Sequence, residues 1–524
     1  MANKMLRTAG FMAAATMLAK ICGMARDMLI GAFFSTGTSA VAYMTASKLP
    51  TMMFDIIIGG VISATFIPVF NSVMEKKSKR EAMEFASKFI TMILIITSLI
   101  SVFGILFADK LINFMAPEFN AETHDLAAKL SSVMFPMIIF TGLAFSFVGI
   151  LQSFGEFNIP AIISLVSNLA IILYFVVFGK KFGVEGLAVT MLFAWSLQVI
   201  IQIPSLKKFG FKYRPSLRLW DENIKAALGI AGPMLISTWV QPLYSIVNSR
   251  LASGIDGGSA VAALEYANRL YVIVVGVFSF VVTNLIFPRM SRANAADDRD
   301  GAKTLVSVSL RAISIVILPI MAGFTILSRS ITSVLYEHGV FTPEAVSMTA
   351  NALLCYSCGM IFLAYNEILS KAFFSMQDAK TPMITALVSM AANIALAYIL
   401  SARLGAGGLA LATAGGSAVN AVLNFILMNK KSGKVFGEKD IKAVIKTLVS
   451  ALVMAAAVYV CSRIMLSHTA GMQAAEWIKS AVVCAVCVPV GIVVYAVCCV
   501  VIGVEDVKNI LAPFIKKIRR QERN

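Results

Sequence analysis

The sequence predicts an all-α polytopic membrane protein with fourteen transmembrane helices. Of its 524 residues, 58% are hydrophobic and only 14% are charged, and the mean hydropathy is +0.82. A soluble domain carries about 25% charged residues, so charge is depleted here along the whole chain. Apolar runs of about 20 residues, the length that crosses a hydrocarbon core as a helix, recur from end to end.

The first apolar run needs separate justification because Lys4 and Arg7 precede it, as basic residues precede the apolar core of a signal peptide. The run continues past the small residues at 13–15 and contains Lys20 and Arg26, so we expect a retained first helix rather than a cleaved signal. The remaining runs follow in the same way, separated by short polar loops. The predicted spans are 8–35, 40–70, 88–108, 130–153, 160–178, 184–204, 224–250, 260–288, 305–327, 346–374, 382–402, 406–428, 443–463 and 478–502.

The basic residues orient these spans. When the loops are assigned alternately to two sides, most of the 45 Lys and Arg residues fall on one side. The positive-inside rule makes that side cytoplasmic, and both termini lie on it, which requires an even number of spans. The net charge of +17 is therefore a topology signal that also attracts anionic membrane lipids, and we expect no nucleic-acid partner. The basic segments on this side are 75–80, 207–218, 289–303, 371–380, 429–434 and 516–523.

Enzyme chemistry has no support in the sequence. The pairs Cys355/Cys358 and Cys484/Cys487 lie inside apolar runs and are interpreted as helix-packing residues rather than metal or redox ligands. The three histidines fall in separate predicted loops, without a nucleophile–base arrangement or a phosphate-binding glycine loop. We expect no catalytic site, no metal and no cofactor.

The two halves of the chain can be aligned at a nearly constant offset. Pro68 of "FIPVF" falls on Pro288 of "FPRM", and Pro160 falls on Pro382. "FGVEGLAV" then falls on "LGAGGLAL" in the same register as the second pair. The predicted organisation is an N-lobe of spans 1–6 at residues 1–221, a C-lobe of spans 7–12 at 222–440, and spans 13–14 with a basic cytoplasmic tail at 441–524.

A duplication of six spans has a functional implication. An even number of spans keeps both copies in the same orientation, related by a pseudo-twofold axis along the membrane normal, with a substrate site between them near the midplane. The pattern therefore favours transport by alternating access. The alternative is that the duplication only produced a stable scaffold.

Charges inside the spans identify the candidate site. Lys20, Arg26, Lys48, Arg269 and Arg311 lie within predicted spans, where each charge near a helix centre costs about 2.5–3.5 kcal/mol. Arg311 lies near the cytoplasmic end of its span, from which its side chain can reach the membrane surface.

The first helix concentrates its polar residues on one side. Lys20, Gly23, Arg26 and Asp27 share a wedge about 120° wide, which is typical of a helix that lines a cavity. Gly23 is also a candidate hinge.

The second and eighth spans add cations of their own. Lys48 is followed seven residues later by Asp55, and Arg269 occupies a nearly equivalent place in the second repeat. One interpretation is that these charges form internal salt bridges that lock helices together. The other is that a bound anion supplies the missing negative charge, since the guanidinium fork suits phosphate or pyrophosphate.

The motifs "GMARDMLIGAFF" (23–34), "KLP" (48–50), "FIPVF" (66–70), "YANRL" (266–270) and "QDAKTP" (377–382) resemble the MurJ/MviN family. These are lipid II flippases of the multidrug/oligosaccharidyl-lipid/polysaccharide exporter superfamily. The resemblance covers most of the chain and is densest in spans 1–2, 8 and 10–11.

The resemblance implies a multi-pass protein of the bacterial cytoplasmic membrane. Its partner would be a lipid-linked peptidoglycan precursor, flipped from the inner to the outer leaflet for cell-wall synthesis alongside the cell-wall machinery. Arg26 and Arg269 match arginines that bind the head group in this family, and Lys20 matches a basic position. We therefore expect Arg26, Arg269, Lys20 and Lys48 to bind substrate. The last two spans would form a groove for the lipid tail.

The sequence departs from the family pattern at several positions. Phe54 stands where some relatives carry an arginine, and Asn268 stands where some carry an aspartate. We expect Asp27, Asp55 and Asn268 to position or balance the cations. Some relatives bind sodium through acids in spans 7 and 11, but here those spans hold Asn248 and Asn393 and no carboxylate. This favours the membrane potential as the driving force.

Three alternative functions stay open from the residues alone. One is a flippase for another isoprenoid-linked oligosaccharide, which would also need a cationic cavity. A second is a multidrug exporter, although cationic drugs would favour acids in the spans. A third is a membrane scaffold or glycosyltransferase, for which the acidic loop at 118–125 is the nearest candidate.

Overall fold

The computed structural model describes residues 2–58, 62–216, 222, 224, 239–504 and 506. Within these ranges every regular element is a helix, which confirms the predicted all-α class. The predicted basic loop at 207–218, the span at 224–250 and the basic tail at 516–523 lie partly or wholly outside the described residues. The chain forms two compact units, residues 1–262 and residues 263–524.

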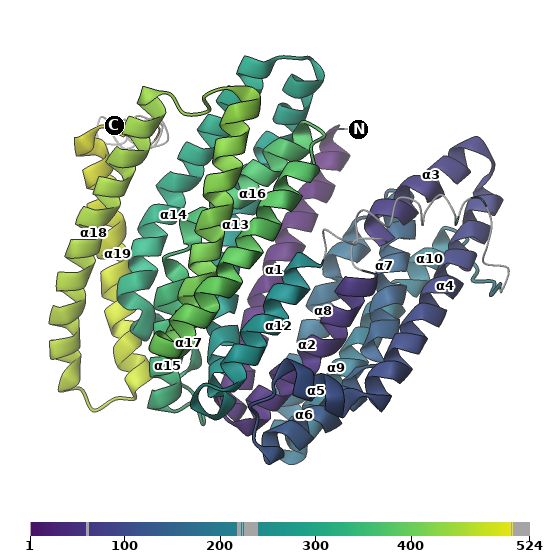
Figure 1. The fold of residues 1–524 in the computed structure, drawn as a ribbon, viewed down its shortest axis with the longest axis horizontal. Helices are drawn as coiled ribbons and strands as arrows, with labels where there is room; N and C mark the ends of the chain where they lie inside the picture. The colour runs from purple at the N-terminus through teal and green to yellow at the C-terminus, as the bar shows by residue number, and fades with distance from the viewer. Residues whose placement is uncertain are drawn as a thin grey trace, which may run out of the picture. The chain divides into compact units, whose positions relative to one another are not determined.

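In the first unit, α1 lies along α8, and α2 packs against α6 (Figure 1). A ring cluster stabilises the interior: the centroid of Phe66 lies 5.6 Å from that of Phe85 and 4.9 Å from that of Phe89. All three rings are at most 1% exposed, so their burial contributes on the order of 2 kcal/mol each. The elements are α1 (Ala2–Phe34), α2 (Thr38–Ile57), the π-helix η1 (Ile62–Phe66), α3 (Ile67–Lys76), α4 (Lys79–Leu106), α5 (Ala108–Met115), α6 (Ala121–Met134), α7 (Met137–Ser153), α8 (Asn158–Val177), α9 (Gly179–Ile200), α10 (Ile203–Lys208), α12 (Val240–Ser253) and the 3-10 helix η2 (Asp256–Gly258).

In the second unit, α14 is the helix against which most others pack. It contacts α15 and α16 as well as α18 and α19, which also pack against each other (Figure 1). Arg311 of α14 forms ion pairs with Asp440 at 3.3 Å and with Asp506 at 3.6 Å, so this charge inside a predicted span joins α14 to α18. The elements are α13 (Ser259–Ala295), α14 (Arg299–Tyr336), α15 (Pro343–Ser357), α16 (Met360–Ser375), α17 (Lys380–Ser432), α18 (Glu438–Ala470) and α19 (Glu476–Ile502).

The helices are long and apolar enough for a polytopic membrane protein. Within the described ranges, eight helices meet the length and composition needed to cross a membrane, and two bent helix pairs raise the number to ten. The bent pairs are α6 with α7 at 40° and α15 with α16 at 48°. The span predicted at 346–374 matches the second pair, and the span predicted at 130–153 covers α7 and only the end of α6. The spans predicted at 382–402 and 406–428 both fall in α17, with the non-helical backbone of Gly405 between them. The polytopic class is confirmed, and the number fourteen stays a prediction.

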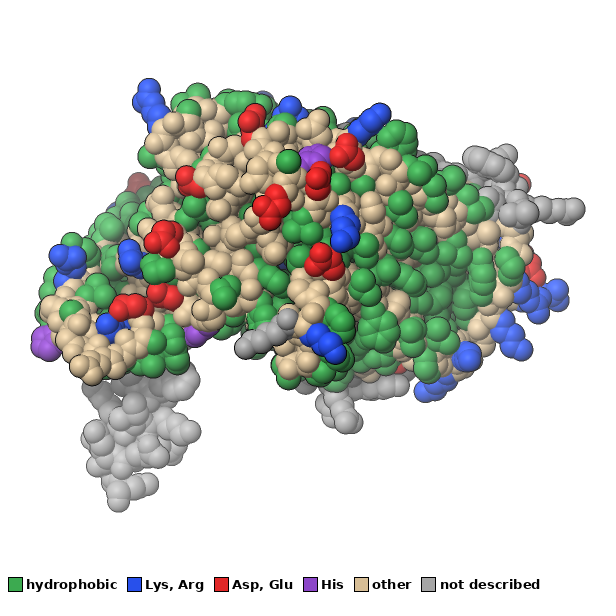
Figure 2. Space-filling model, turned by 90° about the horizontal axis from the view of Figure 1, so that it is seen from below, with side chains coloured by type: hydrophobic (Ala, Val, Ile, Leu, Met, Phe, Trp, Pro, Cys, Tyr) green, Lys and Arg blue, Asp and Glu red, His purple; other side chains and the backbone are tan. Residues whose placement is uncertain are grey.

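The surface of the units agrees with a membrane environment. Large apolar side chains are exposed along the helices, among them Leu99 at 65%, Leu106 at 73% and Val176 at 74%. Figure 2 shows hydrophobic side chains covering broad areas of the face in view, with charged side chains between them. Apolar patches of this extent are covered by lipid or protein rather than by water.

Equivalent helices of the two units begin at equivalent residues. Ser78 caps α4 by accepting a hydrogen bond from the Glu81 amide, and Asp298 caps α14 in the same way. Asn120 caps α6, and Thr342 caps α15. These pairs fall in the register of the sequence alignment, so the helix starts support the predicted duplication.

Candidate functional site

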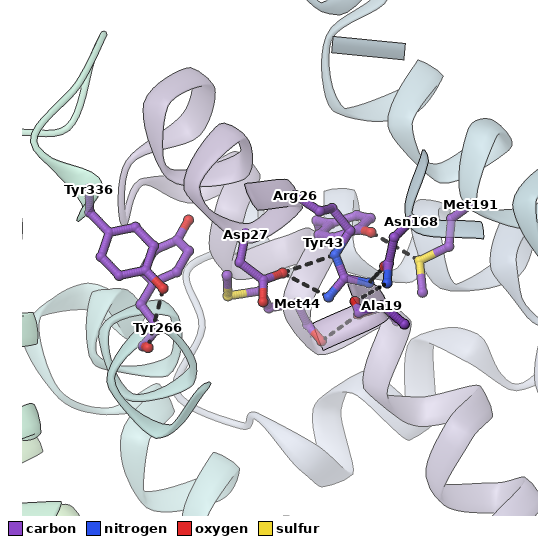
Figure 3. Close-up of polar contacts among 10 residues, drawn as sticks. Ala19, Arg26, Asp27, Tyr43, Met44, Asn168, Met191, Tyr266 and Tyr336 are labelled. Atoms are coloured by element: carbon purple, nitrogen blue, oxygen red, sulfur yellow. Dashed lines mark hydrogen bonds and ion pairs between the residues drawn. The ribbon is translucent and has the colours of Figure 1, made fainter. Parts of the chain in front are cut away.

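The polar wedge of α1 faces α8. Arg26 donates from Nε and Nη2 to Oδ1 of Asp27, at 3.0 and 2.7 Å, and from Nη1 to Oδ1 of Asn168 on α8, at 3.1 Å (Figure 3). The Arg26 side chain is 15% exposed and that of Asp27 is 8% exposed. A pair this deep in a helical bundle is little screened by water, so it fixes the direction of the guanidinium group.

Asn168 completes this link between α1 and α8. Its Nδ2 donates to the carbonyl oxygen of Ala19 at 3.1 Å, so one amide group contacts two successive turns of α1 (Figure 3). A Cβ added at Gly23 would lie 3.4 Å from Nδ2 of Asn168, so Gly23 gives α8 room to approach. The helix continues through Gly23 without a break, and its role as a hinge stays a prediction.

Asn168 is the site residue that the sequence reasoning missed. It lies in the run "SLVSNLAIILYF", where it is the most polar side chain of an otherwise apolar span. A buried amide in such a helix needs hydrogen-bond partners, and that requirement was the available signal. Its partners Ala19 and Arg26 lie 149 and 142 positions away in the sequence, so the pattern around Asn168 could not predict them.

Lys20 also lies on α1, half-buried and one and a half turns before Arg26. Within the described part of the chain, its ammonium group has no hydrogen-bond or ion-pair partner, whereas Arg26 is held by two. The two cations of the first helix are thus in different electrostatic situations. Asp27 and Asn168 orient the Arg26 guanidinium group, and the role of Lys20 as a ligand stays a prediction.

Lys48 and Asp55 lie on α2, which contains Pro50. Lys48 Nζ donates to Oγ of Ser249 on α12 at 3.4 Å, and both charged side chains are half-buried. Phe54 is 6% exposed and stacks on Phe145 with ring centroids 6.0 Å apart. The position at which some relatives carry an arginine is therefore part of the apolar core of this unit.

Asn268 and Arg269 lie on α13 in the second unit, Asn268 half-buried and Arg269 exposed. Rings anchor this part of α13. Tyr266 packs on Tyr336 of α14 at 4.8 Å between centroids and on Phe341 at 5.7 Å, and the Tyr336 hydroxyl donates to the Tyr266 carbonyl at 3.4 Å. With Tyr266 fully buried, the helix turn that follows presents Arg269 to the surface of the unit.

The charged side chains of the predicted site are mainly basic. Among the described residues, no three His, Cys, Asp or Glu side chains are grouped as metal ligands. In the first unit, Lys20, Arg26 and Lys48 place three cations on α1 and α2, with Asp27 and Asp55 as their nearest acids along the sequence. Arg269 belongs to the second unit, and its place in a common site with these residues stays a prediction.

Comparisons with known proteins identify the family of the chain. A family model described as "Lipid II flippase MurJ" matches residues 30–476. The chain is 28% identical over 412 residues to a probable lipid II flippase MurJ of Rickettsia prowazekii, covering 78% of this chain and 81% of that protein. It is 25% identical over 466 residues to a lipid II flippase MurJ of Burkholderia cenocepacia, covering 87% and 89%.

Solved structures show the same fold. A lipid II flippase MurJ in an inward closed conformation matches with a TM-score of 0.80 at 23% identity, over 96% of this chain and 99% of that one. An inward-facing multidrug transporter of the MATE family matches with a TM-score of 0.69 at 16% identity, over 80% and 95%. Because the family model covers most of its length, the chain belongs to the lipid II flippase MurJ family.

Proposed function

We propose that this protein moves lipid II, the undecaprenyl-pyrophosphate-linked peptidoglycan precursor, from the inner to the outer leaflet of the bacterial cytoplasmic membrane. The observation that carries the proposal is the cationic wedge on an apolar helix, in a chain of this family. The relatives it matches are named as known or probable lipid II flippases. Transport requires no catalytic step, and alternating access between the two repeats would expose the site to each leaflet in turn.

The pyrophosphate is the part of lipid II that these cations would bind. Arg26, Arg269, Lys20 and Lys48 are the proposed ligands, with Asp27, Asp55 and Asn268 as positioning or charge-balancing residues. Asp27 shares an acceptor oxygen with two donors of Arg26, so it holds the guanidinium as a phosphate oxygen would. Exchange of Asp27 for pyrophosphate at Arg26 would replace one charge-assisted contact by another of similar geometry. Both termini would face the cytoplasm.

Cells depleted of their own flippase provide the test. We expect Arg26→Ala and Arg269→Ala to abolish rescue of growth and to leave lipid II inaccessible to an impermeant probe at the outer leaflet. Arg80→Ala, which changes a side chain 84% exposed at the start of α4, is the matched control and should rescue fully. Equal membrane levels of all three variants must be verified by immunoblot.

The results separate the site from the function. Full rescue by both Arg26→Ala and Arg269→Ala would refute the proposed site. Stable parent protein that restores no outer-leaflet lipid II would refute lipid II flipping itself, and would favour another isoprenoid-linked oligosaccharide as substrate.

A further inference from the structure

A cavity of about 390 Å³ opens in the second unit, where α13, α16 and α17 end and α14 begins. Three loops that the positive-inside rule places in the cytoplasm, 289–303, 371–380 and 429–434, contribute to its lining. The cavity is therefore expected at the cytoplasmic surface of the membrane. It shares no residue with the α1 site.

The lining of this cavity combines basic and apolar side chains. Arg299, Lys303 and Lys431 carry positive charge, and Asp297 is the one carboxylate among the lining residues. Met290 and Met428 also line the cavity and are each 1% exposed. A lining of this kind matches an amphiphile that carries a negative charge.

Arg299 and Lys303 are held loosely enough to receive an anion, whereas Lys431 is fixed at the cavity wall. Arg299 contacts Asp297 at 3.4 Å with both side chains at least 80% exposed, and Lys303 contacts Asp300, which is 97% exposed, at 3.4 Å. Exposed pairs of this kind contribute little to stability, so a phosphate can replace the carboxylate at small cost. Lys431 is held at the cavity by Asp378 and by Thr381 Oγ1.

The first unit fills the equivalent place with aromatic rings. Phe154 stacks on Phe209 with centroids 5.1 Å apart and packs edge-on against Phe70 at 5.9 Å. Lys79 Nζ lies 5.3 Å from the centroid of Phe154. A cation and three rings thus pack together at this end of the first repeat.

In the second repeat the same positions carry smaller or more flexible side chains. Alignment of "FIPVF" with "IFPRM", of "SFGEF" with "SMQDA" and of "LKKFG" with "NKKSG" replaces the rings by Met290, Met376 and Ser432. All three line the cavity, and Arg299 falls on Lys79. The cavity is therefore lined by three non-aromatic side chains where the first repeat has rings, and a cation stands at the same position in both.

We propose that this cavity binds the phosphate group of an anionic phospholipid from the inner leaflet. The phosphate would contact Arg299, Lys303 and Lys431. The glycerol and the upper acyl chain would lie against the lining methionines Met290, Met376 and Met428. Anionic lipids are concentrated at this surface by basic segments, which favours a lipid over free phosphate as the source.

The test uses the purified full-length chain in a neutral detergent. Dioctanoyl phosphatidylglycerol, dioctanoyl phosphatidylcholine and inorganic phosphate are titrated separately, and the thermal unfolding midpoint is followed. A ligand that binds only the folded state raises this midpoint, and at a given concentration the shift grows with the logarithm of its affinity. We expect phosphatidylglycerol to raise it well above the other two.

Two variants locate the effect. Ser432→Phe restores the ring of the first repeat and should remove most of the phosphatidylglycerol shift. Arg299→Gln combined with Lys303→Gln should weaken the apparent affinity by roughly thirtyfold, the scale expected for two cations at a membrane surface. Lys430→Gln removes an exposed cation outside the lining and should leave the response unchanged.

Three outcomes would overturn the proposal. A phosphatidylglycerol shift that is equal in the parent chain and in folded Ser432→Phe and double-Gln variants would place the lipid elsewhere. A shift by inorganic phosphate as large as that by phosphatidylglycerol would refute the lipid as source. The lack of any shift in the parent chain would refute the site.

Discussion

Asn168 connects two helices through both ends of its amide group. Its Oδ1 accepts a hydrogen bond from Arg26 and its Nδ2 donates to the Ala19 carbonyl, so the residue holds a charge and a backbone group of α1 at once. Hydrogen bonds to charged groups contribute about 1.5–3 kcal/mol, more than the average between membrane helices. The direction of Arg26 therefore depends on a residue of another helix.

We expect Asn168→Ala to lower the free energy of unfolding by about 1–3 kcal/mol, because the Arg26 guanidinium group and the Ala19 carbonyl each lose a hydrogen-bond partner. Thermal unfolding of the purified full-length chain measures this. Asn158→Ala, at the exposed start of the same helix, is the matched control and should stay within about 0.5 kcal/mol of the parent. Equal midpoints for Asn168→Ala and the control would show that the link between α1 and α8 is not stabilising.

The sequence predicts part of the α1 site but not all of its contacts. The wedge of Lys20, Arg26 and Asp27 was predictable, because helix periodicity alone puts these residues on one side. The partners of Arg26 were predictable only in part, since Asp27 is its sequence neighbour but Asn168 arrives through tertiary packing. The ion pairs of Arg311 arise in the same way, from α18 and the segment after α19.

At the scale of elements, two kinks recur at equivalent places. Gly183 adopts φ 56° and ψ −148° within α9, and Gly405 adopts φ 55° and ψ −133° within α17. Only glycine occupies this region readily, since a Cβ would be strained there. The polypeptide thereby changes direction between successive apolar segments without a polar loop.

Gly405→Ala and Gly183→Ala should therefore each destabilise the protein by about 1–3 kcal/mol. Gly323→Ala is the control. Gly323 lies inside α14 with nothing within 4 Å of an added Cβ, and alanine should leave stability unchanged or raise it by up to about 1 kcal/mol. Chemical denaturation of the three variants in one detergent compares them. A Gly405→Ala variant as stable as Gly323→Ala would contradict the strain argument.

Helix positions followed from hydropathy, but helix shapes did not. Apolar runs of about 20 residues predict that a span exists, whereas bends depend on contacts with other helices. The break between α6 and α7 was not predicted. The kink at Gly405 in α17, in contrast, falls between the spans predicted at 382–402 and 406–428.

At the scale of the whole molecule, the distribution of Lys and Arg predicts which helix ends face the cytoplasm. Lys77 lies in the exposed loop before α4, and Asp125 lies exposed near the start of α6. One belongs to a basic predicted cytoplasmic loop and the other to an acidic external segment. This orientation can be measured directly.

A membrane-impermeant maleimide should label Asp125→Cys in intact spheroplasts and Lys77→Cys only after permeabilisation. Labelling is read relative to the parent chain, whose eight cysteines are free thiols. The reverse pattern would invert the predicted topology and would place the cavity of the second unit on the outer surface.

The bond between Arg26 and Asn168 has a thermodynamic consequence for transport. The same guanidinium group that we propose as a pyrophosphate ligand also fastens α1 to α8. A ligand that draws Nη1 of Arg26 away from Asn168 removes one of the bonds between these helices. Linkage is reciprocal, so displacement of α1 from α8 must in turn change the affinity of Arg26 for its anion. Binding of substrate and displacement of the first helix are then coupled, and the coupling free energy is of the order of one charged hydrogen bond.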